Sequence, residues 1–482
     1  MSHYKPDPKK NVNLTINGIP VTVPEGTRIL EAARKVGVKI PTLCEHPDIC
    51  KNAVCRICTV ECDGRGKLIA ACANDVWEGV NIVTNNLRIL EIRKTIIELI
   101  LANHPQDCTD CPKNKNCSLQ TIAADFGIRK SPFPLDPIEP RPAAQAQTLV
   151  FDMGKCIKCG RCVEACQEMQ AVRAINTSGR GGHYRITVPY NDALEDSPCV
   201  FCGLCAELCP VGAIYAHNDT EKAWKLINDK NCFTAAQFDP SICGTLEKIA
   251  GLHKGTVTEG KIASALKLMG INKVFDGRTV KDLRFIQECN ILLDRIKGKA
   301  ALPMISGSSP GISKFVEYHY PDLLDRLCHK DDKGLNVFFR CIIKKFWHSI
   351  DWGLNPEKIS CISIEQGIAQ KFTGKSPEIN SAQKDNIVLT VNELALMLRQ
   401  KGINIKVLDE APFDLFNIQL PEKNKMENIS YAQHEIEQSE IILSDEIRAK
   451  MLTVHGLSNA RPVLDSISKG ECKADWIKIE LF

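Results

Sequence analysis

Two runs of closely spaced cysteines offer the ligands of a metal-sulfur site. They are Cys156-x2-Cys159-x2-Cys162-x3-Cys166 and Cys199-x2-Cys202-x2-Cys205-x3-Cys209, the second followed by Pro210. This spacing is typical of paired [4Fe-4S] clusters, in which the fourth cysteine of each run ligates the cluster of the other run. We therefore expect one cluster on Cys156, Cys159, Cys162 and Cys209, and another on Cys199, Cys202, Cys205 and Cys166. Zinc also binds paired C-x2-C elements, but its sites do not use this spacing.

An earlier group of cysteines predicts a [2Fe-2S] cluster. The ligand candidates are Cys44, Cys55, Cys58 and Cys72, arranged as a long loop, a close pair and a distant fourth cysteine. This order resembles that of plant-type ferredoxins, although the spacing is different. Cys50 and Cys62 lie in the same region and could replace one of the four, but we expect both to be buried spectators.

A histidine and three cysteines follow in the pattern His104-x3-Cys108-x2-Cys111-x5-Cys117. A lone histidine at the end of a helix is usually structural, but three cysteines in register with it favour a [4Fe-4S] site with one His and three Cys ligands. A neutral imidazole in place of a thiolate makes the cluster less negative. By the reasoning that applies to Rieske centres, the reduction potential of this cluster should be higher than that of an all-cysteine site.

Local patterns predict the elements that position these ligands. Alternating apolar residues on either side of Asn17-Gly18 predict a β-hairpin over residues 12–23, and a helix should follow from Ile29 to Val36. A hairpin, a helix and a cysteine-rich loop are typical of a β-grasp domain. A helix over residues 87–103 delivers His104, and a proline-rich connector covers 131–147.

Beyond residue 222 the cysteines become sparse and the pattern becomes α/β. Residues 387–390 predict a strand, residues 392–401 a helix closed by Gly402, and residues 403–408 a second strand, which together would form a βαβ unit. A further strand should cover residues 476–482. An additional cluster could use the isolated Cys232 and Cys243, but positions in the core are the simpler explanation for both cysteines.

Composition narrows the class of protein. The 482 residues suggest several domains, and a formal charge of +3 from 61 basic and 58 acidic side chains does not favour a nucleic-acid surface. The 24 cysteines would indicate disulfides in a secreted protein, but the first residues show no signal-peptide pattern. No apolar stretch is long enough to span a bilayer. We expect a cytoplasmic protein that binds neither membrane nor nucleic acid.

The order of these modules, together with three C-terminal segments, resembles the [FeFe]-hydrogenases. The segments are PMISGSSPG at 303–311, KFVEYHYP at 314–321 and GLSNA at 456–460. The resemblance implies an α+β multidomain protein with four parts: a β-grasp [2Fe-2S] domain (1–84), a His-ligated [4Fe-4S] domain with linker (85–147), a bacterial-type 2[4Fe-4S] ferredoxin domain (148–222) and a truncated hydrogenase-like α/β domain (223–482).

The sequence departs from active family members at the ligands of the catalytic H-cluster. Their first motif is Thr-Ser-Cys-Cys-Pro, where Ser308 and Ser309 stand here, and their second is Met-Pro-Cys-x-x-Lys, where Gly367 and Gln370 stand. The third motif would supply two more cysteines, about where the sequence stops at Phe482. A hydroxyl is a poor ligand for such iron, and glycine supplies none. The resemblance therefore implies one [2Fe-2S] and three [4Fe-4S] clusters, no H-cluster and no catalytic residue, with the H-cluster cavity filled by side chains.

Among members of this family, the chain is most similar to the H-cluster-less α subunit of electron-bifurcating transhydrogenases of the Stn type. That resemblance implies a hetero-oligomer with an FMN- and NADH-dehydrogenase-like flavoprotein subunit, an NADPH-binding flavoprotein subunit and ferredoxin as partners. The paired clusters would exchange electrons with ferredoxin, and the other two would connect toward a flavin. Alternatives are a relay subunit of a formate dehydrogenase or multimeric [FeFe]-hydrogenase, a redox sensor, which would need an output module that we do not find, and a hydrogenase with other ligands.

Overall fold

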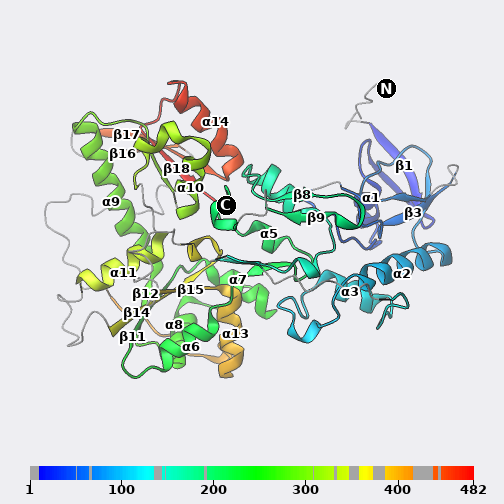
Figure 1. The fold of residues 1–482 in the computed structure, drawn as a ribbon, viewed down its shortest axis with the longest axis horizontal. Helices are drawn as coiled ribbons and strands as arrows, with labels where there is room; N and C mark the ends of the chain where they lie inside the picture. The colour runs from blue at the N-terminus through cyan, green and yellow to red at the C-terminus, as the bar shows by residue number, and fades with distance from the viewer. Residues whose placement is uncertain are drawn as a thin grey trace.

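The cysteine-rich parts of the chain lie to one side of a larger α/β region (Figure 1). The computed structural model describes residues 10–49, 52–63, 68–134, 144–146, 148–188, 193–307, 309–329, 334–346, 358–372, 386–415, 438–442 and 447–481. A small sheet of N-terminal strands lies at one end of the long axis, and the α/β region lies at the other (Figure 1). The described parts of residues 144–216 lie between them (Figure 1). No helix in the described ranges is both long enough and apolar enough to cross a bilayer.

The N-terminal domain is built on a five-stranded sheet in the order β2-β1-β5-β3-β4. Its elements are β1 (Asn11–Ile16), β2 (Ile19–Pro24), α1 (Ile29–Lys35), β3 (Thr59–Cys62), β4 (Leu68–Ala70) and β5 (Asn81–Val83). The predicted hairpin is confirmed: Ile16 pairs with Ile19, and Asn17 and Gly18 both have positive φ, as a tight two-residue turn requires. Val12, Leu14 and Ile16 alternate into the core.

The predicted helix before His104 is also present. α2 (Leu87–Ala102) is capped by Asn86, whose side chain accepts a hydrogen bond from the backbone N–H of Ile89. The chain then turns through η1 (Cys108–Asp110) into α3 (Ser118–Asp125). The backbone N–H of Ser118 donates to the carbonyl of Pro210 at 2.9 Å, so the start of α3 is tied to the second cysteine run.

The middle segment is a ferredoxin-like unit of short strands and short helices. A three-stranded sheet in the order β10-β7-β6 is formed by β6 (Ala144–Gln145), β7 (Leu149–Phe151) and β10 (Ile214–Ala216). Each cysteine run leads into a short helix, α4 (Arg161–Glu164) continuing into the π-helical η3 (Ala165–Met169), and α5 (Leu204–Glu207). The hairpin β8 (Asn176–Ser178) and β9 (Arg185–Thr187) lies between the two runs.

The α/β region contains two four-stranded sheets. The first is parallel and has the order β12-β11-β14-β15, from β11 (Phe233–Phe238), β12 (Lys273–Asp276), β14 (Ile359–Glu365) and β15 (Asn386–Thr390). The second has the order β13-β18-β17-β16, from β13 (Met304–Gly307), β16 (Gln438–Ile442), β17 (Arg448–His455) and β18 (Trp476–Glu480). The helices are α6 (Thr220–Asn228), α7 (Ile242–Ala250), α8 (Glu259–Met269), α9 (Gly277–Lys297), α10 (Pro310–His319), α11 (Gly334–Phe346), α13 (Val391–Lys401) and α14 (Leu457–Ser468).

One predicted strand of this region is wrong. β15 and α13 match the predicted strand and helix, and β18 matches the strand that begins at residue 476, but residues 403–408 do not continue the sheet. They contain the 3-10 turn η11 (Ile405–Val407), which begins where the Asn404 side chain accepts a hydrogen bond from the N–H of Lys406. β15 is the edge of its sheet. An asparagine side chain that accepts from the backbone two residues further on therefore overrides the alternating apolar pattern.

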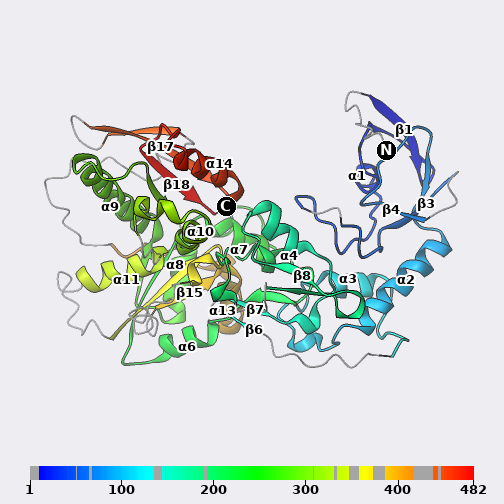
Figure 2. The ribbon, with the colours of Figure 1, turned by 45° about the horizontal axis from the view of Figure 1, so that its top comes forward.

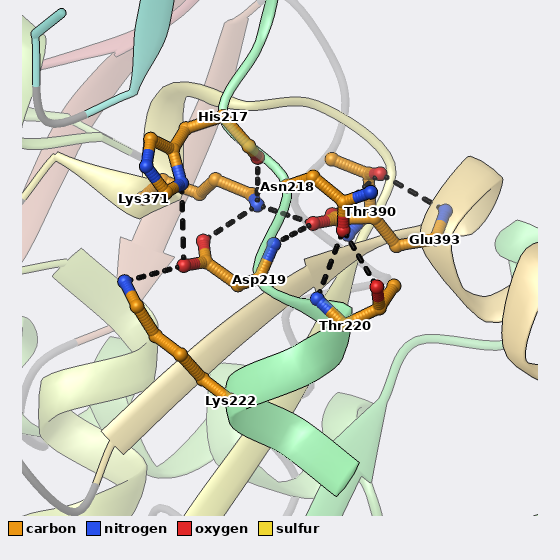
Figure 3. A network of polar contacts seen from close by, with 8 residues as sticks. All are labelled: His217, Asn218, Asp219, Thr220, Lys222, Lys371, Thr390 and Glu393. Carbon is orange, nitrogen blue, oxygen red and sulfur yellow. Dashed lines mark hydrogen bonds and ion pairs between the residues drawn. The ribbon is translucent and has the colours of Figure 1, made fainter. Parts of the chain in front are cut away.

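A buried ion-pair network joins the middle segment to the α/β region (Figure 3). The Lys371 ammonium donates to Asp219 at 2.9 Å, to Glu393 at 2.8 Å and to the carbonyl of His217 at 2.8 Å. Glu393 also accepts from the backbone of Thr390 and so caps α13. Lys371 is 2% exposed in its side chain, so the network is screened little by solvent.

The last helix makes a second connection to the middle segment. The guanidinium of Arg461, on α14, donates to the carbonyl of Ala171 at 2.6 Å. α14 and the marked C-terminus lie beside the middle segment in both views (Figures 1 and 2). Apolar residues of α14, including Leu457 and Leu464, belong to the same core as Val172 and Ile175. The ferredoxin-like unit and the second sheet thus share one hydrophobic core.

Candidate functional site

The four cysteines proposed for the [2Fe-2S] cluster converge beside the N-terminal sheet. The Cys44 sulfur is hydrogen-bonded to the side chains of Cys55 and Cys72, and the sulfurs of Cys58 and Cys72 are 3.3 Å apart. These contacts depress the pKa of Cys44 to about 2 and raise that of Cys72, because the thiol that ionises first accepts from its neighbours. Cys62 is a core residue on β3, and Cys50 lies outside the described residues.

The residues of the predicted His-ligated site lie where α2 and η1 meet the middle segment. Burial is the largest cause that lowers the pKa of His104, so its imidazole is neutral at physiological pH. Its Nδ1 is buried and has no hydrogen-bond partner among the described residues. Burial raises the pKa of Cys117, and the charges of Cys111 and Cys108 add to this shift, so these three thiols are neighbours. His104 and Cys111 both lie close enough to Lys155 for their charges to interact. A neutral imidazole with an unpaired nitrogen, together with three thiols, fits a ligand set for iron.

Gly212 and Lys155 connect this site to the middle segment. A Cβ on Gly212 would overlap the sulfur of Cys111, so the glycine permits the close approach. Lys155, which precedes Cys156, is largely buried and forms ion pairs with Asp107 at 3.4 Å and Asp152 at 3.3 Å. The two candidate cluster sites are therefore adjacent, with one buried cation between them.

The first ferredoxin-like site brings Cys209 to the first cysteine run. A small cavity is lined by the sulfur-bearing residues Cys156, Cys159, Cys162 and Cys209, together with Ile157, Ile186 and Val211. Burial raises the pKa of Cys159 to about 12, and the charge of Cys209 adds to this shift. Burial keeps these thiols protonated as long as the apolar cavity holds no metal. An iron-sulfur cluster fits the cavity because its iron ions would replace the thiol protons.

The second site brings Cys166 to the second run. Burial raises the pKa of Cys199, Cys202 and Cys205, and the charge of Cys166 contributes at each of the three. This grouping has the crossed arrangement that the spacing predicts, although ligation itself remains a prediction. The donor set, four thiols around one buried point, fits a [4Fe-4S] cluster.

The α/β region encloses this second site. Phe201, between Cys199 and Cys202, stacks on Phe372 with ring centroids 4.2 Å apart, and the Lys314 ammonium lies 4.8 Å from the Phe201 ring centre. A Cβ on Gly203 would overlap the Ile368 side chain, and one on Gly311 would overlap the carbonyl of Val200. The two segments that resemble hydrogenase motifs, 303–311 and 365–370, therefore lie against the cysteine loop.

A cavity of about 230 Å³ remains where those two segments meet. It lies at the carboxyl ends of β13, β14 and β18, which is where open α/β sheets place ligands. Its lining includes Ser309, Gly367 and Gln370, and none of the described lining residues is a cysteine. Ser308 lies outside the described residues. The expectation that side chains fill this cavity is wrong, because the neighbouring side chains leave the space beside Gly367 unoccupied.

Charged residues line much of this cavity. They are Lys281, Arg284, Glu288, Glu365, Lys478 and Glu480. Burial raises the pKa of Glu365 to about 7, opposed by the positive charge of Lys281. The sequence alone did not identify these residues, because they come from α9, β14 and β18 and no local spacing connects them.

Comparison with known proteins identifies each part of the chain. Residues 233–481 match the family described as iron only hydrogenase large subunit, C-terminal domain. Residues 9–87 match a 2Fe-2S iron-sulfur cluster binding domain, and residues 93–132 match the NADH-ubiquinone oxidoreductase-G iron-sulfur binding region. Residues 146–215 match the ferredoxin-like domain of NADH-quinone oxidoreductase subunit 3. The chain thus contains 2Fe-2S and 4Fe-4S binding domains and a hydrogenase-like C-terminal domain.

Similar proteins are subunits of oxidoreductases. The chain is 33% identical to the NADP-reducing hydrogenase subunit HndD of Solidesulfovibrio fructosivorans over 84% of this chain and 71% of that relative. It is 33% identical to the NADPH-Fe(3+) oxidoreductase subunit alpha of Geobacter sulfurreducens over 48% of this chain and 26% of that protein. A crystal structure of NAD+-reducing [NiFe]-hydrogenase matches 42% of this chain and 87% of that one, at 30% identity and a TM-score of 0.41. The chain belongs to the iron-only hydrogenase large-subunit family.

Proposed function

We propose that this chain is the iron-sulfur electron-transfer subunit of a flavin-based electron-bifurcating transhydrogenase, and that it has no hydrogenase activity of its own. The observation that carries the second part is the cavity beside the second ferredoxin-like site. Where the resemblance places two ligands of the catalytic cluster, Ser309 and Gly367 line the cavity instead. Neither side chain supplies a thiolate to iron.

The proposed electron path uses four ligand groups held by three consecutive domains. Clusters in these sites would accept and release single electrons. The chain holds the His104 group against the middle segment through Lys155 and Gly212, and it buries both ferredoxin-like sites. Such a series has use only between redox partners, which the names of the relatives suggest to be NAD(P)-linked subunits. We infer that the partners are an FMN-containing NADH-dehydrogenase-like subunit, an NADPH-binding flavoprotein and ferredoxin.

The hydrogenase-like region has a structural role in this proposal. Ile368, Phe372 and Lys314 cover the loop that carries Cys199, Cys202 and Cys205. This cover excludes water from the second ferredoxin-like site, and a dry, low-dielectric environment affects the potential of a cluster. Deleting residues 223–482 should therefore expose this cluster to solvent and oxygen.

The test is to purify the native complex anaerobically, identify its subunits by mass spectrometry, and measure its flavin and iron. Two flavoproteins, of which one is specific for NADPH, are the expected partners. A molybdenum-dependent formate dehydrogenase, or a hydrogenase with an intact catalytic subunit, would instead make this chain a relay subunit. A relay subunit of a hydrogenase assembly is the second candidate, because the Solidesulfovibrio relative is named a subunit of an NADP-reducing hydrogenase.

A further inference from the structure

Three side chains with different donor atoms come close together beside the cavity of the α/β region. They are Glu288 on α9 and the consecutive pair Cys328 and His329, and one ligand atom from each lies within 4.8 Å of the other two. In the part of the chain that the structure describes, this is the one group of at least three such side chains with so close a spacing. Four-coordinate zinc needs donor atoms roughly 3 to 4 Å apart, given its bond lengths, so a small inward movement would close this group around one ion.

The fold holds the two parts of this group together independently of any ion. Leu327 forms an isolated parallel bridge with Ile305 on β13, and the backbone N–H of Cys328 donates to the carbonyl of Ile305 at 2.7 Å. α9 packs against the same strand, because Cys289 and Leu292 share a core with Met304. The segment 327–329 and the helix that carries Glu288 are therefore anchored on one strand.

A divalent ion at this group would lie beside one buried carboxylate and two cationic side chains. Glu288 is 3% exposed and accepts from Arg284 Nε at 3.1 Å through its Oε1 atom, which leaves the other carboxylate oxygen for a metal. Lys478 also lies close enough for its charge to be influenced by Glu288. A carboxylate and a thiolate together neutralise a divalent ion. Because the Cys328 thiol releases its proton when the ion binds, the local charge rises by one unit, not two, beside these two cations.

We propose that Glu288, Cys328 and His329 bind one zinc ion. One sulfur, one imidazole nitrogen and one carboxylate oxygen are ligands that zinc accepts, and three protein ligands leave a fourth position for water or a small molecule. Cys328 and His329 are partly exposed, which gives the ion a path to the site. Because Glu288 also lines the cavity of about 230 Å³, the ion would fix the α9 wall of that cavity. This site is separate from the four cluster sites and does not depend on the proposed electron transfer.

The experiment uses the full chain, loaded anaerobically with its clusters, then exposed to zinc and desalted. Metal analysis gives zinc and iron per chain, and zinc K-edge X-ray absorption gives the ligands without interference from iron. We expect about one zinc per chain, with one sulfur at about 2.3 Å and the other ligands at about 2.0 to 2.2 Å. Cys328→Ser and His329→Ala should each weaken zinc binding by at least about tenfold.

The control is Cys472→Ser, which removes another partly buried cysteine of the same region and should retain zinc as the wild type does. A zinc shell dominated by sulfur would mean that the ion occupies an unfilled cluster site, and would overturn the proposal. It would also be overturned if Cys328→Ser bound zinc with unchanged affinity, or if the wild-type chain retained no zinc.

Discussion

At the scale of single residues, the position of each fourth cysteine decides how the two ferredoxin-like sites are connected. Cys209 lies with the first run and Cys166 with the second, so each site takes three residues from one loop and one from the other. Neither site can form unless both runs are folded together. The proposed clusters would thereby act as cross-links within one small core.

Pairs of cysteine variants test this crossing. Cys209→Ala and Cys156→Ala should each remove about four irons per chain, and so should the double variant, because both residues serve one cluster. Cys166→Ala combined with Cys156→Ala should remove about eight irons, since two clusters are lost. Iron analysis with electron paramagnetic resonance of the reduced protein makes the measurement. The reverse pattern of losses would show that each run holds its own cluster.

Glu365 gives the cavity a pH-dependent contribution to stability. Its carboxylate faces the cavity while protein surrounds it, and burial raises its pKa to about 7, above the ordinary value of 4.5. A raised pKa means that the folded chain binds this proton more tightly than the unfolded chain. The stabilisation is therefore complete below about pH 4.5 and is lost as the pH rises through 7.

Glu365→Gln should remove this dependence. Relative to the variant, the wild type should lose roughly 1 to 3 kcal/mol of stability between pH 5 and pH 8, a range that allows for partial solvent screening. Thermal unfolding of the cluster-loaded chain at several pH values would measure the difference. Parallel curves for the two proteins over this range would contradict the assignment.

At the scale of elements, the sequence predicts features that are decided locally. The hairpin at Asn17-Gly18 and the helix before His104 follow from turn chemistry and periodicity within a few residues. The cysteine loops are local for the same reason. The turn at 405–407 and the charged cavity are not decided locally. The turn depends on which strand ends the sheet, and the cavity depends on side chains from separate elements.

Gly203 tests the contact between the second cysteine loop and the segment 365–372. Gly160 and Gly203 are equivalent positions, each with φ near +80° before a short helix. A Cβ at 160 would meet the flexible side chain of Asn52, whereas one at 203 would overlap the buried Ile368. Gly203→Ala should therefore be the more damaging substitution, by about 1 to 3 kcal/mol.

Cluster content after mild oxygen exposure and thermal stability are the measurements for this pair. Adding Ile368→Ala to Gly203→Ala should restore part of the loss, because it removes the overlapping atoms. Equal effects at the two glycines, with no rescue, would mean that strain from positive φ alone explains both.

At the scale of the whole molecule, the middle segment is held between the other parts by polar contacts and a shared core. Lys371 bridges Asp219 and Glu393 from a nearly completely buried position (Figure 3). Removing its charge would leave two carboxylates without their central cation. Such a loss is more costly than removing a surface ion pair.

Lys371→Met should destabilise the junction by about 3 kcal/mol. Lys222→Met is the matched control: this lysine donates to the same Asp219 at 2.7 Å but is 64% exposed, so its loss should cost under about 1 kcal/mol. Hydrogen exchange of residues 214–220 and 391–398 would report local opening. Similar protection in the two variants would show that the network contributes no more than a surface pair.

We propose that this chain carries electrons through four clusters and has no site for hydrogen chemistry. A reductive titration of the anaerobic, cluster-loaded chain, with gas analysis under reduced methyl viologen, tests both parts in one sample. We expect an uptake of about four electrons per chain, one for each cluster, and no hydrogen. Sustained hydrogen evolution, or an uptake clearly below four electrons from a chain with full iron content, would contradict it.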